Sequence, residues 1–216
     1  MQPTIVELGT SLFSVCAAPD GRHAVAGCFD KTIRVISLPS GNALRTLKGH
    51  TGWVPSVCVS PDGEHIVSGS FDKIVRVWRL ADGAAVWALK GHSNFVLSVC
   101  TSPDNQHIVS GSGDCTVRIW SMADGKAVRT LKGHAGPVCS VCVSPDSKHV
   151  VSGSSDKTVR VWTLADGAVV RTLQGHTSDV DSMHISPDGR HIVSGSYDKT
   201  ARIWSAADGS LVRKLD

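Results

Sequence analysis

The sequence contains no long apolar run and no block of like charge. Its 216 residues carry a formal net charge of +3, with basic and acidic residues mixed along the chain. No apolar run approaches the roughly 18 residues that a membrane-spanning helix needs, and the first residues lack the basic segment of a signal peptide. The absence of a basic stripe argues against DNA or RNA as a partner. We therefore expect a soluble protein of the cytoplasm, with the nucleus left open as a location, and without a membrane or nucleic-acid partner.

Of the seven cysteines, one pair has C-x-x-C spacing, Cys139-Ser140-Val141-Cys142, and it lies within a predicted strand. An odd count with no second pair to complete a set of metal ligands predicts neither a disulfide framework nor a zinc site, and it fits a reducing compartment. No metal or cofactor is expected. Four cysteines recur at one repeat position, where we expect small buried apolar residues on an inner strand: Cys16, Cys58, Cys100 and Cys142.

One stretch of sequence returns along the whole chain. SGSFDKIVRVW at 68–78 recurs as SGSGDCTVRIW at 110–120, SGSSDKTVRVW at 152–162 and SGSYDKTARIW at 194–204, and in altered form as AGCFDKTIRVI at 26–36. The copies lie 42 residues apart without an insertion or deletion. Self-similarity at a constant period is the sequence signature of a repeat architecture. We predict a single array over 1–216, with repeats at 7–48, 49–90, 91–132, 133–174 and 175–216, and with 1–6 forming part of an extra outer strand.

Each repeat has the pattern of four short strands. In 49–90, β-branched runs at 54–60, 65–70, 74–80 and 84–90 are separated by turn sequences such as Pro61-Asp62-Gly63. Because every link is short, neighbouring strands must pair antiparallel, and both faces of the resulting sheet carry apolar side chains. Sheets that need cover on both faces are satisfied by radial stacking around an axis. The predicted fold is therefore all-β, a β-propeller of five four-stranded antiparallel blades.

A Gly-His pair precedes each of the last four copies at constant spacing. Together with Ser-Gly-Ser-x-Asp and V-R-V-W, this pair resembles the WD-repeat β-propeller family over essentially the whole chain. In that family a histidine, a serine, an aspartate and a tryptophan form a hydrogen-bonded network inside each blade. The resemblance implies four such networks, leaving open which serine takes part: His50, Asp72 and Trp78; His92, Asp114 and Trp120; His134, Asp156 and Trp162; His176, Asp198 and Trp204.

The first repeat departs from this pattern. Leu8, Ala26, Cys28 and Ile36 stand where the other repeats have histidine, two serines and tryptophan, so only Asp30 of the network remains. We expect this blade to be the least rigid of the five, or a terminal cap.

A set of serine, histidine and aspartate also occurs in hydrolases as a catalytic triad. Here the set is present in four copies at one spacing, which indicates a structural role in every copy. An active site at the channel mouth would need a unique cluster of acids, bases or metal ligands, and Asp179 and Asp181 are the only non-repeated cluster. We predict no enzyme activity and no catalytic residue.

The number of blades raises the question of closure, because propellers typically have about four to eight blades and WD-repeat rings most often have seven. There are six candidates for the outermost strand against five sets of inner strands, at 3–8, 43–48, 85–90, 127–132, 169–174 and 211–216. Three arrangements are consistent with this count: a closed five-bladed ring fastened by a terminal strand, an open or incomplete ring from a larger array, and a ring completed by another copy. We favour a monomeric five-bladed arrangement, with self-association expected if the ring is incomplete.

Function is expected where the copies differ. The resemblance places three variable repeat positions on the upper face of the propeller, around the central channel, where peptide partners dock. Aromatic and apolar residues occupy them in the first three repeats, and acidic residues and a tyrosine in the last, so the candidate partner-binding residues are Phe13, Phe29, Trp53, Phe71, Phe95, Leu97, Asp179, Asp181 and Tyr197. This surface predicts a non-enzymatic interaction scaffold for a protein or peptide with an apolar anchor and a basic residue.

Two other interpretations remain open. The aromatic residues could fill the channel mouth or pack against the altered first blade, since single exposed aromatics are common. The chain could also be a multivalent, lectin-like binder with one small-ligand pocket in each blade, which predicts that the ligand-facing residues repeat.

Overall fold

The computed structural model describes residues 9–216, so the predicted outer strand at 3–8 lies outside the described residues. Twenty strands form five separate four-stranded sheets, and within each sheet the strands pair in chain order. All pairings are antiparallel. No helix in the described part of the chain is long and apolar enough to cross a bilayer. The all-β class and the five four-stranded blades predicted from the sequence are confirmed.

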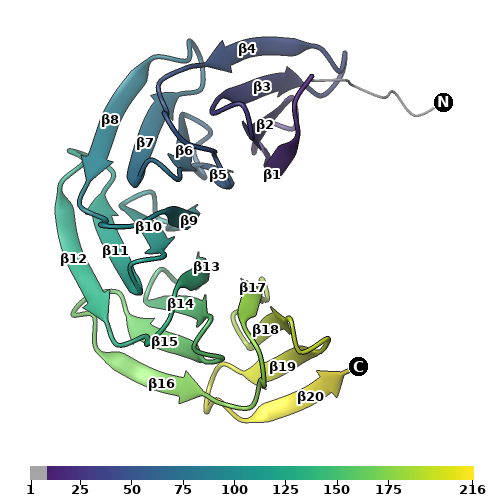
Figure 1. Ribbon diagram of the computed structural model, residues 1–216, viewed down its shortest axis with the longest axis vertical. Helices are drawn as coiled ribbons and strands as arrows, with labels where there is room; N and C mark the ends of the chain where they lie inside the picture. The colour runs from purple at the N-terminus through teal and green to yellow at the C-terminus, as the bar shows by residue number, and fades with distance from the viewer. Residues whose placement is uncertain (1–8) are drawn as a thin grey trace.

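The five sheets, here called blades 1 to 5, follow one another along the chain. Their bounds are, for blade 1, β1 (Leu12–Ala17), β2 (His23–Cys28), β3 (Ile33–Ser37) and β4 (Ala43–Leu47); for blade 2, β5 (Ser56–Val59), β6 (His65–Gly69), β7 (Ile74–Arg79) and β8 (Ala85–Lys90); for blade 3, β9 (Val96–Thr101), β10 (His107–Ser112), β11 (Thr116–Ser121) and β12 (Ala127–Lys132); for blade 4, β13 (Val138–Val143), β14 (His149–Ser154), β15 (Val159–Thr163) and β16 (Val169–Leu173); and for blade 5, β17 (Val180–Ile185), β18 (His191–Ser196), β19 (Ala201–Ser205) and β20 (Leu211–Leu215). The first strand of every blade lies nearest the centre of the arrangement and the fourth strand lies outermost (Figure 1).

Local chemistry explains the turns between these strands. In blade 2 the Asp62 carboxylate accepts the backbone N–H of Glu64, and Gly63 has a φ of +73°, which a glycine adopts without strain. In the next turn the Asp72 carboxylate accepts the N–H of Ile74 at 3.0 Å. Aspartate therefore organises both turns by capping backbone donors two residues ahead.

The apolar core is divided into four clusters, one between each pair of successive blades. Between blades 3 and 4, Val109 and Val117 of one sheet pack against Val138 and Val141 of the next, and all four are buried. The blades come so close that a Cβ atom added at Gly111 would lie 2.8 Å from Val138 Cγ1. Burial of both faces of each inner blade is the main source of stability for this arrangement.

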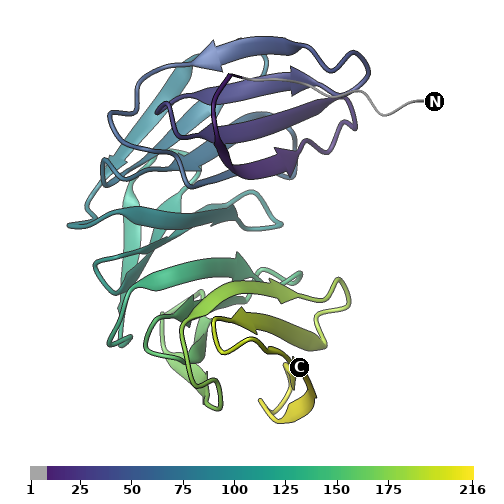
Figure 2. The ribbon, with the colours of Figure 1, turned by 45° about the vertical axis from the view of Figure 1, so that its right-hand side comes forward.

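The five blades form an open arc and not a closed ring, as two views of the molecule show (Figures 1 and 2). The last strand, β20, pairs with β19 of its own blade, and β4 pairs with β3 of the first blade. No strand within 9–216 bridges the first and last sheets. Over residues 9–216 the closed five-bladed ring is therefore not observed, because every outer strand there pairs within its own blade.

All seven cysteines are free. The four repeated ones lie on the inner strands, as predicted, but they are half-buried and not fully enclosed. Desolvation raises the pKa of the Cys142 thiol to about 12, and it raises the pKa of Cys58 and Cys100 as well. These thiols are therefore protonated packing groups.

Candidate functional site

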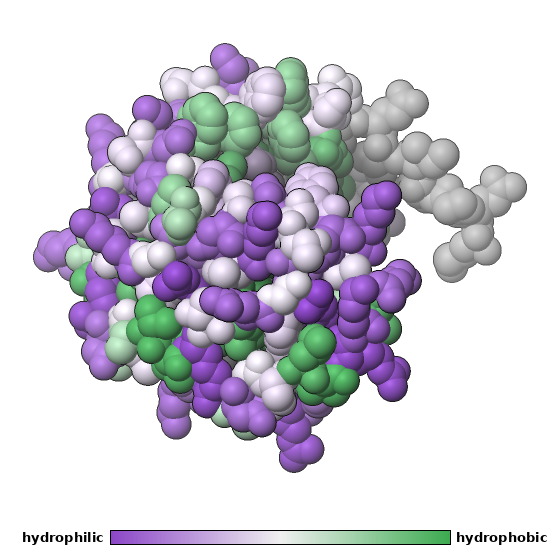
Figure 3. Space-filling model, turned by 60° about the horizontal axis from the view of Figure 1, so that its bottom comes forward, coloured by the Kyte–Doolittle hydropathy of each residue, from purple (hydrophilic) through white to green (hydrophobic). Residues whose placement is uncertain are grey.

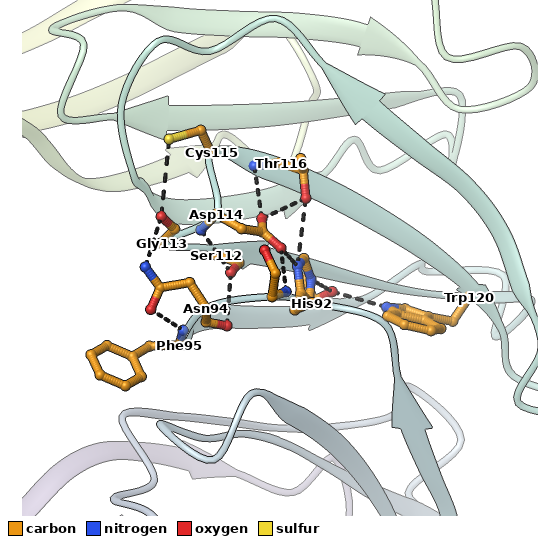
Figure 4. Close-up of polar contacts among 11 residues, drawn as sticks. His92, Asn94, Phe95, Ser112, Gly113, Asp114, Cys115, Thr116 and Trp120 are labelled. Atoms are coloured by element: carbon orange, nitrogen blue, oxygen red, sulfur yellow. Dashed lines mark hydrogen bonds and ion pairs between the residues drawn. The ribbon is translucent and has the colours of Figure 1, made fainter.

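The polar network in blade 3 connects four side chains in sequence (Figure 4). His92 donates from Nδ1 to Asp114 Oδ2 at 2.8 Å, and its Nε2 accepts the hydroxyl proton of Ser110 at 2.8 Å. The indole Nε1–H of Trp120 donates to the same serine oxygen at 2.9 Å. Ser110 is therefore the hub that joins the imidazole on β9's lead-in loop to the tryptophan on β11.

The same bonds occur in blades 2, 4 and 5, which answers the question that the sequence left open. The serine in each network is the first of the two in Ser-Gly-Ser: Ser68, Ser110, Ser152 and Ser194. The second serine makes other hydrogen bonds. In blade 3, Ser112 donates to the carbonyl of Asn94 at 3.1 Å and accepts the backbone N–H of Asp114 at 3.1 Å.

The electrostatics fit an ionised aspartate beside a neutral histidine. Burial tends to raise the pKa of Asp114, but hydrogen bonds from Thr116 and His92 outweigh it and lower the pKa to about 2. The balance at Asp156 in blade 4 is the same, and its pKa is also lowered to about 2. Burial lowers the pKa of His92 by more than the Asp114 carboxylate raises it. The imidazole therefore has one proton, on Nδ1, and a free Nε2 that accepts from serine.

Each set connects a serine, a histidine and an aspartate as in a catalytic triad, but a substrate cannot reach the serine hydroxyl. The Ser110 side chain has no exposed surface, and its oxygen already accepts the Trp120 indole proton. A nucleophilic serine must reach an incoming carbonyl group. The four sets are therefore structural, each linking the lead-in loop of one blade to its second and third strands.

The altered first blade uses a different contact. In blade 3, Arg118 lies over the Trp120 ring, with its Cζ 5.8 Å from the ring centroid. In blade 1, Ile36 replaces the tryptophan, and Arg34 donates to the Asp30 carboxylate at 2.7 Å. The Asp30 side chain is 35% exposed, against 7% for Asp114. A partly exposed ion pair thus replaces the buried network in this blade.

Five of the predicted partner-binding residues form a continuous row of rings across blades 1 to 3, which we call the aromatic ladder: Phe13, Phe29, Trp53, Phe71 and Phe95. Successive ring centroids are 6.0, 4.3, 5.3 and 4.4 Å apart. These separations are typical of favourable aromatic pairs. The ladder lies on one face of the arc, where the first strands begin, and we call this face the upper face.

The backbone explains why the ladder is continuous. The turn between β6 and β7 is tied to the lead-in loop of its own blade, since the Phe71 N–H donates to the Trp53 carbonyl at 2.9 Å. The same turn is tied to the next blade, since the Val96 N–H donates to the Ser70 carbonyl at 3.0 Å. A side chain on this turn therefore lies between two lead-in loops, and aromatic rings at all these positions must meet.

The rings of the ladder are in contact with one another and still exposed. Trp53 is 37% exposed, Phe95 42%, Phe29 45% and Phe13 46%, whereas Phe71 is half-buried. The interpretation that these aromatics pack against the first blade is correct in part, because Phe13 and Phe29 stack with Trp53. They do not fill an enclosed channel mouth. The ladder presents its outer edges to solvent.

The remaining candidates extend along the same face. Leu97 is half-buried on β9, two residues after Phe95 in the sequence. In blade 5, Tyr197 is 69% exposed and donates its N–H to the Asp179 carbonyl at 3.0 Å. Asp181 is exposed on β17. The structure therefore does not bring Asp179, Asp181 and Tyr197 into the ladder but places them at the far end of the arc.

Blade 4 lies between the ladder and these carboxylates. Burial raises the pKa of its Cys139 thiol, and the negative charges of Asp181 and Asp179 raise it further. The Cys139 sulfur also contacts Ser155 Oγ at 3.4 Å. We call Asp179 and Asp181 the acidic edge.

Two further features were missed by sequence reasoning. A groove of about 630 Å³ opens between blades 4 and 5, at the strand ends opposite the aromatic ladder, where Ala206 contributes to its wall. The corresponding residues of blades 2 to 4 are larger and buried: Leu80, Met122 and Leu164. Comparing the repeats at this one position would have revealed the missing side-chain volume.

The second missed feature is a cluster of three possible ligand side chains. Asp62, Glu64 and His65 have oxygen and nitrogen atoms within 4.8 Å of one another. The cluster surrounds the turn between β5 and β6, and Asp62 Oδ1 already accepts hydrogen bonds from Ser60 and from the Glu64 N–H. Turn formation therefore accounts for this arrangement.

A comparison with models of protein families gives a direct result. The model described as "WD domain, G-beta repeat" matches the chain five times, at 6–37, 41–79, 83–121, 125–163 and 167–205. The chain belongs to the WD-repeat family. WD-repeat proteins are in general non-enzymatic scaffolds for protein interaction, and the resemblance found from the motifs is confirmed. No match was found among curated proteins.

Proposed function

We propose that this WD-repeat chain is a non-enzymatic scaffold that holds a peptide or an extended protein segment on its upper face. The observation that supports this proposal is the aromatic ladder, five stacked rings that remain 37–46% exposed at four positions. Large aromatic groups that are rigid and exposed supply binding energy at little cost in side-chain entropy. The histidine, serine and tryptophan side chains that repeat in blades 2 to 5 are buried, whereas four rings of the ladder face solvent.

The ladder suits an apolar anchor residue of the partner. Trp53 occupies its centre, in contact with Phe13, Phe29 and Phe71. An aliphatic or aromatic side chain placed on these rings would bury apolar surface, and each Å² buried would contribute about 25 cal/mol of favourable free energy. The face drawn in Figure 3 is mainly hydrophilic, with apolar side chains in separate small patches.

The acidic edge suits a lysine or arginine of the same segment. Asp181 is exposed and Asp179 half-buried, so a cation can approach their carboxylates from solvent. Charges at the rim of an interface contribute mainly to specificity and to the rate of association. A segment with an apolar anchor and a basic residue, spaced to span blade 4, would match the face.

No observation favours the alternative of one small-ligand pocket in each blade. Within residues 9–216, the repeated histidine, serine and tryptophan side chains of the networks are buried, and the residues at the variable positions of the upper face differ from blade to blade.

The test is a selection from a random-peptide display library on the whole chain, followed by titration calorimetry of the selected peptides. We expect enriched peptides to contain an aromatic or aliphatic anchor and a lysine or arginine. Trp53→Ala should weaken their binding at least tenfold. Asp181→Lys should weaken the parent peptide but not the same peptide with its basic residue changed to alanine.

Two matched variants control for loss of fold and for non-specific charge effects. Trp87→Ala removes the same residue type from the outermost strand β8, and Asp124→Lys reverses an exposed charge on the turn between β11 and β12. Both should bind like the parent chain. Selected peptides that bind Trp53→Ala and Asp181→Lys as tightly as the parent would overturn the proposal, and so would a selection that enriches nothing.

A further inference from the structure

The four interfaces between blades are built from the same two halves. The leading half, from the second to fourth strands of one blade, includes Val109 and Leu131, which are 0% and 3% exposed. The following half, from the first strand of the next blade, includes Val138 and Val141, which are 0% and 5% exposed. Each half is apolar and fits the other, so an uncovered half specifies the chemistry of its partner.

Blade 5 has an uncovered leading half. Val193 is 37% exposed, whereas its counterparts Val25, Val67, Val109 and Val151 are at most 1% exposed. Leu215 is 45% exposed, whereas Leu47, Leu89, Leu131 and Leu173 are at most 5% exposed. This is the face that packs against a first strand everywhere else in the chain.

Blade 1 has an uncovered following half. Leu12 is 42% exposed, and its counterparts Val54, Val96, Val138 and Val180 have no exposed surface. Val15 is 62% exposed, and its counterparts Val57, Val99, Val141 and Met183 are at most 6% exposed. The molecule therefore presents both halves of one interface, at opposite ends of the arc (Figure 1).

The glycine in the second strand of each blade gives independent evidence that blade 5 lacks a neighbouring first strand. At Gly69, Gly111 and Gly153 an added Cβ would lie 2.6 to 2.8 Å from a valine of the following blade. At Gly195 of blade 5 the only nearby atom is Ser182 Oγ, from the same blade. The space over Gly195 therefore matches the branched side chain at the start of a first strand, which Leu12 supplies at the other end.

An interblade hydrogen bond points to the same partner. The hydroxyls of Ser14, Ser56, Ser98 and Ser140 each accept a backbone N–H from the first strand of the following blade, at 3.0 to 3.3 Å. These donors are Val57, Val99, Val141 and Met183, whose counterpart in blade 1 is Val15. The counterpart acceptor in blade 5 is Ser182, which is exposed. Docking of Val15 on Ser182 would complete the series.

We propose that blade 5 of one copy binds blade 1 of a second copy, in the geometry that joins successive blades within the chain. The contact is heterologous, because two different surfaces meet. Two copies contain ten blades, which exceeds the four to eight of typical propellers. The copies therefore add end to end as an open chain whose length grows with protein concentration.

The test uses light scattering on the whole chain and on variants that block one end each. Val15→Asp places a charge on the face of blade 1, and Val193→Asp places one on the face of blade 5. The parent chain should show an average mass that rises with concentration. Each variant alone should remain monomeric to at least tenfold higher concentration, while an equimolar mixture of the two should form a dimer, because the mixture contains one intact copy of each end.

Val128→Asp is the matched control, since Val128 is 44% exposed on the outer strand of an interior blade. It should associate like the parent, and circular dichroism should show the same strand content in all variants. The proposal is overturned if the parent stays monomeric at every concentration, if association survives both end variants, or if the mixture of the two forms no dimer.

Discussion

At the scale of single residues, the buried serine hydroxyl is the central element of each blade. Ser110 donates to His92 and accepts from Trp120, so one oxygen atom satisfies two buried nitrogen atoms. Each partner alone would be a buried polar group without a bond, which is costly in an apolar interior. A single hydroxyl thereby fixes the relative positions of the lead-in loop, the second strand and the third strand.

Ser110→Ala should lower the free energy of unfolding by about 1–3 kcal/mol, because it leaves both nitrogens unpaired. Urea unfolding followed by tryptophan fluorescence measures this change. The matched control is Ser93→Ala, in the exposed lead-in loop of the same blade, where blade 4 already has Ala135. An unchanged stability for Ser110→Ala would contradict the role assigned to the hub.

Acid should destabilise the fold in two stages. The pKa of His92 and of His134 is lowered by burial, so unfolded chains bind protons first and stability is lost as the pH falls below about 6.5. The pKa of Asp114 and of Asp156 is lowered to about 2, so their contribution is present above about pH 4 and is lost as the pH falls toward 2. Both effects lower the free energy of unfolding as the pH falls.

The free energy of unfolding should therefore fall steadily between about pH 6.5 and pH 3. Asp114→Asn should reduce the slope below about pH 4 as well as the stability at neutral pH. Glu64→Gln removes the same charge from an exposed turn and serves as the comparison. A stability that rises on acidification would refute the assignment of neutral histidine and ionised aspartate.

Residue-level prediction from sequence succeeded where the repeat fixes the chemistry. The histidines, aspartates and tryptophans recur at constant spacing, and the resemblance to the WD-repeat family implied that they form networks. The choice between Ser68 and Ser70 could not be made from the sequence, because both lie on the same face of one strand, two residues apart. Only the three-dimensional position of the imidazole shows which serine it binds.

At the scale of elements, five nearly identical sheets experience different surroundings. An inner blade is covered on both faces, whereas blades 1 and 5 each have one uncovered face. A substitution at one repeat position should therefore have a cost that depends on which blade contains it. This dependence is a property of the arc and not of the repeat.

Gly111→Ala should cost about 1–3 kcal/mol, because the new Cβ would lie 2.8 Å from Val138 Cγ1 and 2.9 Å from Val141 Cγ1 of the next blade. Gly195→Ala should cost much less, since the Cβ meets only the Ser182 hydroxyl, which can rotate away. Urea unfolding of the two variants at low protein concentration compares them directly. Equal costs would indicate that a sheet covers Gly195 in solution.

Strand boundaries and pairing were accessible from the sequence because turn residues and β-branched runs alternate in every repeat. The groove beside Ala206 was accessible in principle, through the loss of a leucine or methionine at one repeat position. The row of aromatic contacts could not be predicted from the sequence, since it depends on a turn of one blade lying between two lead-in loops. The two pairs that are 24 positions apart, Phe29 with Trp53 and Phe71 with Phe95, become neighbours only when the blades stack.

At the scale of the whole molecule, the number of blades and the closure of the ring are separate properties. The sequence predicts five blades because it contains five copies. Closure depends on the angle between successive blades, which is set by how the side chains of neighbouring sheets pack in three dimensions. The structure shows an open arc in which the first and last blades do not meet (Figure 1).

The most direct test of the open arc is small-angle X-ray scattering of the unmodified chain, recorded on the monomer as it elutes from a size-exclusion column, so that both end faces are intact. The account predicts a scattering profile that fits the open five-bladed arc, with the first and last blades apart. A profile that fits a compact, closed five-bladed ring would contradict it, and would mean that the two end faces meet within one molecule.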